Sequence, residues 1–85
     1  MDKRVASTYE VDFTGLKLPI IAVYQSPRDY PGCYVARVFD VDKPTNVIIT
    51  RDNLEDLQQD IAEHTGMVFI PRSMEDGQQV IGTWI

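Results

Sequence analysis

The chain is poor in the residues that form covalent cross-links and metal sites. Its 85 residues include one cysteine, Cys33, and one histidine, His64. A single cysteine forms no internal disulfide, and a secreted domain of this size usually carries several, so we expect the protein in the reducing cytoplasm. One cysteine and one histidine also supply too few ligands for a tetrahedral zinc site, so no metal is expected.

Motifs for nucleotide binding and for hydrolase nucleophiles are absent as well. The sequence contains no GxGxxG, no GxxxxGK[ST] and no GxSxG, so no cofactor is expected. The longest apolar run, residues 19–24, is far too short to span a bilayer. The first residues lack an apolar core of signal-peptide length, so we expect a protein that neither enters a membrane nor carries a standard export signal.

Positive charge is scarce and dispersed. Eight Lys and Arg residues stand against 13 Asp and Glu residues, which gives a formal net charge of -5. Only Lys3 and Arg4 are adjacent, whereas nucleic-acid binding relies on clustered basic side chains that neutralise several phosphates. No nucleic-acid partner is expected.

The composition, 44% hydrophobic and 25% charged, predicts one small globular domain over residues 1–85, with residues 1–8 polar enough to be loosely held. Pro31 and Gly32 predict a turn in which the glycine adopts a positive φ. Two further turns are expected, at residues 42–46 and 71–77. β-branched and aromatic residues predict five strands, over residues 17–25, 33–41, 46–50, 67–70 and 79–85.

A helix is predicted over residues 53–64. Asp52 is expected to cap its first turn, Glu55 to reach back as in a capping box, and Gly66 to end the helix with a positive φ. Its apolar positions recur at helical spacing, at Leu54, Leu57 and Ile61. Its acidic positions are expected to form a solvated face, with Asp52, Asp56, Asp60 and Glu63.

These elements follow one another in the order β-β-β-α-β-β. Short loops between successive strands predict antiparallel neighbours. The narrow apolar stripe of the helix covers only one side of such a sheet. The sequence therefore predicts an α+β fold, an antiparallel β-sheet with one main helix packed on one face.

The helix entry DNLEDL, residues 52–57, follows a short strand and is similar to the D-T-L-E-E-A entry of HicB-like antitoxin domains. The resemblance covers residues 17–70 and implies a partial RNase H-like fold and a small toxin as partner. It also implies Asp52 as the helix cap, with Leu54 and Leu57 in the core. The family's Pro-Gly-Cys motif follows the second strand, whereas residues 31–33 precede it here.

Cys33 and His64 are the candidates for a nucleophile and a base, and a small enzyme that uses Cys33 is the remote alternative. No flanking basic residue activates this thiol, and a small buried or interfacial side chain suits the start of a strand. His64 is explained by the end of the predicted helix, where positive charge is favoured. No catalytic residue is therefore expected.

The second predicted strand is apolar on both sides, although one helix can cover only one of them. A second copy of the chain, a small protein partner, or residues 1–16 folded back as a strand are the candidate covers for the other side. Arg37 suits an interface, or an open face where its stem packs and its head reaches water. We expect a non-catalytic protein-interaction or assembly domain whose candidate surface consists of Cys33, Val35, Arg37 and Phe39.

Overall fold

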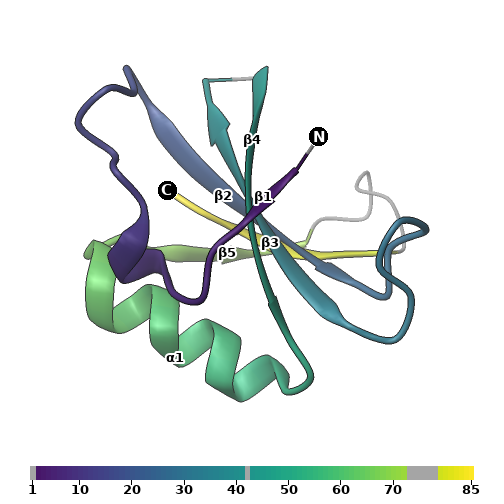
Figure 1. The fold of residues 1–85 in the computed structure, drawn as a ribbon. Helices are drawn as coiled ribbons and strands as arrows, with labels where there is room; N and C mark the ends of the chain where they lie inside the picture. The colour runs from purple at the N-terminus through teal and green to yellow at the C-terminus, as the bar shows by residue number, and fades with distance from the viewer. Residues whose placement is uncertain (1, 42, 73–78) are drawn as a thin grey trace.

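The computed structural model describes residues 2–41, 43–72 and 79–85 (Figure 1). In this part of the chain one α-helix packs on one face of a six-stranded sheet, which confirms the predicted α+β class. The elements in chain order are β1 (Lys3–Arg4), the 3-10 helix η1 (Thr8–Glu10), β2 (Pro19–Gln25), β3 (Tyr34–Asp40), β4 (Lys43–Arg51), α1 (Leu54–Thr65), β5 (Phe69–Pro71) and β6 (Val80–Trp84).

The sheet has the strand order β1-β4-β3-β2-β6-β5. Strands β2, β3 and β4 form the predicted antiparallel meander, and β6 and β5 extend it with further antiparallel pairs. At the opposite edge β1 pairs with β4 in parallel, with Lys3 opposite Val47. The prediction of an antiparallel sheet is therefore wrong at this edge, and the sheet is mixed.

The turn predicted at residues 42–46 is wrong in the part that the structure describes. Residues 43–46 lie in β4, and Asp42 lies outside the described residues. Pro44 has no N–H to donate to a sheet, yet it pairs with Phe39 beside a shift in the β3–β4 register. Such irregular positions are where a sheet tolerates proline, so the proline that suggested a turn belongs to a strand.

Helix α1 is capped by Asn53 rather than by the predicted Asp52. The Asn53 Oδ1 accepts hydrogen bonds from the amides of Glu55 at 2.8 Å and Asp56 at 3.3 Å. Asn and Asp cap helices about equally well, so capping preference alone does not distinguish Asn53 from Asp52. Gly66 ends the helix with a φ of 69°, as predicted.

The core lies between α1 and the sheet. The apolar stripe of the helix contributes Leu57 and Ile61, both fully buried, and Ala36 and Val38 face them from β3. Trp84 of β6 donates its Nε1 hydrogen to the Gln58 side chain at 2.9 Å, which ties the last strand to the helix. The buried cluster consists of Ile21, Val23, Ala36, Val38, Ile49, Leu57, Ile61 and Trp84.

The segment between β1 and β2 lies on the helix side of the sheet. Figure 1 shows it in purple beside the C-terminal end of α1. Val11, Phe13 and Leu16 pack against the core from there. The alternative that residues 1–16 cover the opposite face as an added strand is therefore wrong for most of this segment.

Strand β5 forms the second edge of the sheet. Just before it, Val68 and Ile85 exchange backbone hydrogen bonds of 2.8 and 3.0 Å. Because these bonds alternate along an antiparallel pair, Phe69 and Pro71 direct their backbone groups away from β6. Pro71, the first residue of the turn predicted at residues 71–77, lies in β5, and residues 73–77 lie outside the described residues.

Candidate functional site

The sheet face opposite α1, which we call the open face, carries three of the four residues of the predicted interaction surface. Side chains alternate along a strand, and Val38 of β3 belongs to the core on the helix side. Val35, Arg37 and Phe39 therefore point to the open face. Cys33 precedes β3 and lies in the turn between β2 and β3.

Arg37 organises one end of the open face. Its two terminal nitrogens donate to the two carboxylate oxygens of Asp2 at 2.8 and 3.0 Å, and one of them also lies 3.4 Å from Asp29. The hydroxyl of Tyr30 donates to Asp2 at 3.0 Å. These bonds hold the N-terminus and the β2–β3 loop against the sheet, where Val35 is only 2% exposed.

The same contacts shift the ionisation of the groups involved. Hydrogen bonds from Arg37 and then from Tyr30 lower the pKa of Asp2 to about 2. The bond to Asp2 raises the pKa of Arg37 in spite of partial burial, which acts in the opposite sense. Burial, followed by the bond to Asp2, raises the pKa of Tyr30. At neutral pH the pair is therefore fully ionised and its phenol donor is protonated.

At the other end of the open face, apolar side chains are in contact with solvent. Val68 is 66% exposed, Ile85 53% and Ile70 46%. Val68 pairs with Ile85, and Ile70 lies opposite Thr83 two positions along, so these side chains are neighbours. Together with adjoining residues of β2, β3 and β6 they form what we call the apolar patch, which consists of Ile20, Ala22, Phe39, Val68, Ile70, Thr83 and Ile85.

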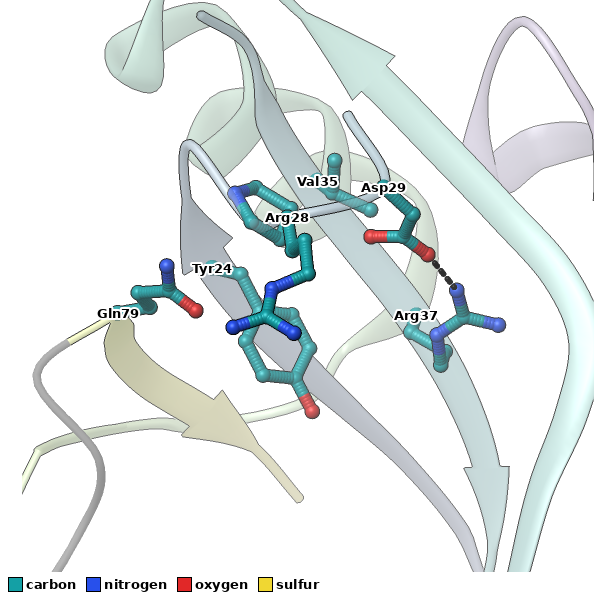
Figure 2. A pocket seen from close by; sticks show the side chains of 7 residues that line it. Tyr24, Arg28, Asp29, Val35, Arg37 and Gln79 are labelled. Carbon is teal, nitrogen blue, oxygen red and sulfur yellow. Dashed lines mark hydrogen bonds and ion pairs between the residues drawn. The ribbon is translucent and has the colours of Figure 1, made fainter. Parts of the chain in front are cut away.

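A shallow pocket of about 220 Å³ lies at the end of the open face where Arg37 holds Asp2 and the β2–β3 loop, which we call the covered end (Figure 2). The ion pair between Asp29 and Arg37 forms one side of it. No sequence spacing brings Gln79 next to the loop after β2, so the pocket was not predicted. Its lining residues are Tyr24 from β2, Pro27, Arg28 and Asp29 from the β2–β3 loop, Val35 and Arg37 from β3, and Gln79 before β6.

The structure does not bring Cys33 and His64 together. Cys33 is partly buried in the β2–β3 loop, where its carbonyl accepts a hydrogen bond from the Ser26 amide at 2.8 Å. His64 lies in the last turn of α1, and Figure 1 shows that end of the helix on the opposite side of the molecule from this loop. A nucleophile and its base must be within hydrogen-bond reach, so these two residues do not form such a pair.

A second polar cluster joins the N-terminal segment to α1. Asp60 accepts hydrogen bonds from the Ser7 hydroxyl at 2.7 Å, the Thr8 hydroxyl at 2.5 Å and the Thr8 amide at 2.8 Å. The Arg51 guanidinium lies 3.3 Å from the same carboxylate. The prediction that Asp60 belongs to a solvated face is wrong, because its side chain is only 11% exposed. The sequence feature that could have predicted this burial is the position of Asp60 at the border of the apolar stripe of α1.

The geometry of this cluster is that of a docking contact. In a Ser-His-Asp triad the two ring nitrogens face different partners. Here the His64 Nδ1 faces the hydroxyls of Ser7 and Thr8, both at 3.4 Å, and Asp60 at 3.6 Å, while both hydroxyls donate directly to Asp60. Burial opposes ionisation of Asp60, but hydrogen bonds from Thr8 and Ser7 and the charge of Arg51 lower its pKa. The ionised carboxylate anchors η1 on the helix.

Within residues 2–41, 43–72 and 79–85, no group of three or more His, Cys, Asp or Glu side chains is placed to hold a metal ion. In the same part of the chain no helix has the length and apolar character to cross a membrane. No protein-family model, curated protein or solved structure matches this chain. Its function must therefore be inferred from its own side chains.

Proposed function

We propose that this protein is a non-catalytic interaction domain that pairs with a second copy of itself through the apolar patch. The observation that carries this proposal is the exposure of three large apolar side chains in one place, with Val68, Ile70 and Ile85 between 46 and 66% exposed. Single exposed apolar residues are ordinary on protein surfaces, whereas contiguous ones mark interaction sites.

The arrangement of the patch favours a symmetric pair. A two-fold axis lets the same surface serve both partners, which is the commonest way in which soluble proteins form oligomers. The patch contains no acidic residue, although the chain carries a net charge of -5. Like charges are therefore kept out of the centre of the interface, and the interface core resembles the apolar cores of known dimers.

The compartment and the partner belong to the same proposal. The single cysteine of the chain favours the reducing cytoplasm as the place where this pairing occurs. The resemblance of the α1 entry to HicB-like antitoxin domains supports a second candidate occupant of the patch, a small toxin. We favour self-pairing because it requires only the surface that the structure shows.

Light scattering over a dilution series tests the proposal. At about 100 µM the mass should be that of a dimer, because a Kd of about 1 µM leaves little monomer at that concentration. Val68→Glu adds a charge at the most exposed position of the patch and should give a monomer with an unchanged fold. Tyr9→Glu is the matched control, since Tyr9 is 80% exposed on the helix side, and it should remain dimeric.

A monomer mass at that concentration would contradict self-pairing. Dimers that persist in Val68→Glu but dissociate in Tyr9→Glu would also contradict it, because they would locate the interface on the helix side. Binding to a defined small toxin, lost in Val68→Glu, would then assign the patch to the second candidate.

A further inference from the structure

The pocket at the covered end of the open face gathers three polar groups that have no partner among the described residues. Among the residues that the structure describes, the Arg28 guanidinium, the Tyr24 hydroxyl and the Gln79 side-chain amide make no hydrogen bond or ion pair. Figure 2 shows these three side chains around the pocket. We propose that the pocket binds a carboxylate group, with Arg28 as the main donor and Tyr24 and Gln79 as supporting donors.

The distribution of charge singles out Arg28. The other arginine of the pocket, Arg37, is already engaged by Asp2 through two hydrogen bonds and by Asp29 at 3.4 Å. Arg28 has no such carboxylate in the described part of the chain and is exposed. A guanidinium presents two parallel N–H donors that match the two oxygens of a carboxylate, so an external carboxylate completes its coordination.

The backbone that carries the donors is held in place before any ligand arrives. The Ser26 amide donates to the Cys33 carbonyl at 2.8 Å, which closes the loop that carries Arg28. The Gln25 amide donates to the Gln79 carbonyl at 2.7 Å, which fixes the backbone of Gln79 beside β2. A preformed loop lowers the entropy lost on binding, so even a small ligand can bind measurably.

Size and lining restrict the ligand to a small group. Pockets for drug-sized molecules have volumes of about 300 to 1,000 Å³, whereas this one has about 220 Å³. Pro27 and Val35 supply apolar walls for a short aliphatic stem. Burial raises the pKa of Tyr24, so its hydroxyl remains a donor at neutral pH. An aspartate or glutamate side chain of a partner protein, or a small free carboxylic acid, has this chemistry.

NMR titration of the full chain with acetate tests the proposal, at constant ionic strength. Saturable shifts are expected for Tyr24 and Gln79 and for the Arg28 side-chain N–H group. Arg28→Gln should weaken binding about tenfold, because it removes a charged hydrogen-bond donor. Arg28→Lys keeps the charge but loses the paired donors, and should weaken binding by a smaller factor. Tyr24→Phe should weaken it several-fold while the ring packing is kept.

Lys17→Gln is the matched control, since Lys17 is exposed at the other end of β2 and should bind acetate as the parent does. A capped peptide with one glutamate that binds more tightly than acetate would identify the source as a protein side chain, and equal affinity would identify a free acid.

Three outcomes would overturn the proposal: no saturable shifts, equal losses in Arg28→Gln and Lys17→Gln, or tighter binding of inorganic phosphate. Pocket and patch lie at opposite ends of the open face, so a monomer in light scattering leaves this test unaffected.

Discussion

The two faces of the sheet are covered by different means. On the helix side a continuous apolar layer joins α1 to the strands, and Leu57 and Ile61 are fully buried. On the open face the covered end is held by a few charged and phenolic groups around Arg37, and the other end is exposed. The helix side therefore holds the larger buried apolar cluster, and the open face leaves three large apolar side chains in contact with solvent.

The largest effect is expected where the helix side is weakened. Leu57→Ala should lower the free energy of unfolding by about 2 to 5 kcal/mol, because it leaves a cavity in a fully buried position. Val68→Ala on the open face should change it by less than about 0.5 kcal/mol when measured on dilute protein. Urea denaturation of both variants provides the measurement. Equal losses would show that the open face is as much a core as the helix side.

A smaller loss is expected at the carboxylate that joins the N-terminal segment to the helix. Asp60→Asn should cost about 1 to 3 kcal/mol, because partly buried donors of Ser7, Thr8 and Arg51 lose an ionised acceptor. Glu63→Gln, on the exposed side of the same helix, is the control and should cost a few tenths of a kcal/mol at most. Similar urea midpoints for the two variants would refute this role of Asp60.

The pH dependence of that contact has a defined sign. The pKa of Asp60 is lower in the folded state than the ordinary aspartate value of 3.8. Its contribution is therefore complete above the unfolded-state pKa and disappears as pH falls through the folded-state pKa. The stability difference between parent and Asp60→Asn should shrink as the solution is acidified below that ordinary value, as followed by urea denaturation at several pH values.

The helix cap provides a smaller and more local effect. Asn53→Ala should lower the free energy of unfolding by about 1 kcal/mol, because the amides of Glu55 and Asp56 lose their acceptor. Asp52→Ala should be close to neutral, since Asp52 is exposed and makes no cap bond in the described contacts. The reverse order of the two urea midpoints would show that Asp52, and not Asn53, caps the helix.

The smallest effect on stability, and the clearest in spectroscopy, is expected on the open face. NMR titration of the Asp2 carboxylate should give a pKa of about 2. Arg37→Gln removes the largest cause of that shift and should return the pKa toward the ordinary value of 3.8. Because the folded-state pKa is the lower one, this contact contributes above the unfolded-state pKa and is lost as pH falls. An unchanged pKa in Arg37→Gln would show that the contact is absent in solution.

Local patterns predicted the elements of this fold better than its connections. The spacing of Leu57 and Ile61 was sufficient to predict the helix and its buried side, and Gly66 its end. By contrast, β1 spans only Lys3–Arg4, two charged residues whose pairing with β4 depends on contacts distant in sequence. A strand of this length has no periodicity of its own, which is why the parallel edge was not predicted.

The candidate site was predicted in part for the same reason. Alternation along β3 predicted that Val35, Arg37 and Phe39 share a side, and the structure places them on the open face. The partners of Arg37, which include Asp2 and Tyr30, come from other segments and have no motif. Of these three residues Phe39 belongs to the apolar patch, and whether the predicted residues form an interaction surface in solution stays a prediction.

Pro71 and the short β1 leave the sheet with poor edges for the addition of strands. β5 offers the outward N–H of Phe69, but Pro71 has none to give, and β1 ends after two residues. A dimer formed face to face buries the surface through which it pairs. A strand added at an edge instead creates a new edge, to which further chains can add. If the proposed pairing holds, concentrated protein should stop at a closed pair and remain free of amyloid-like fibres.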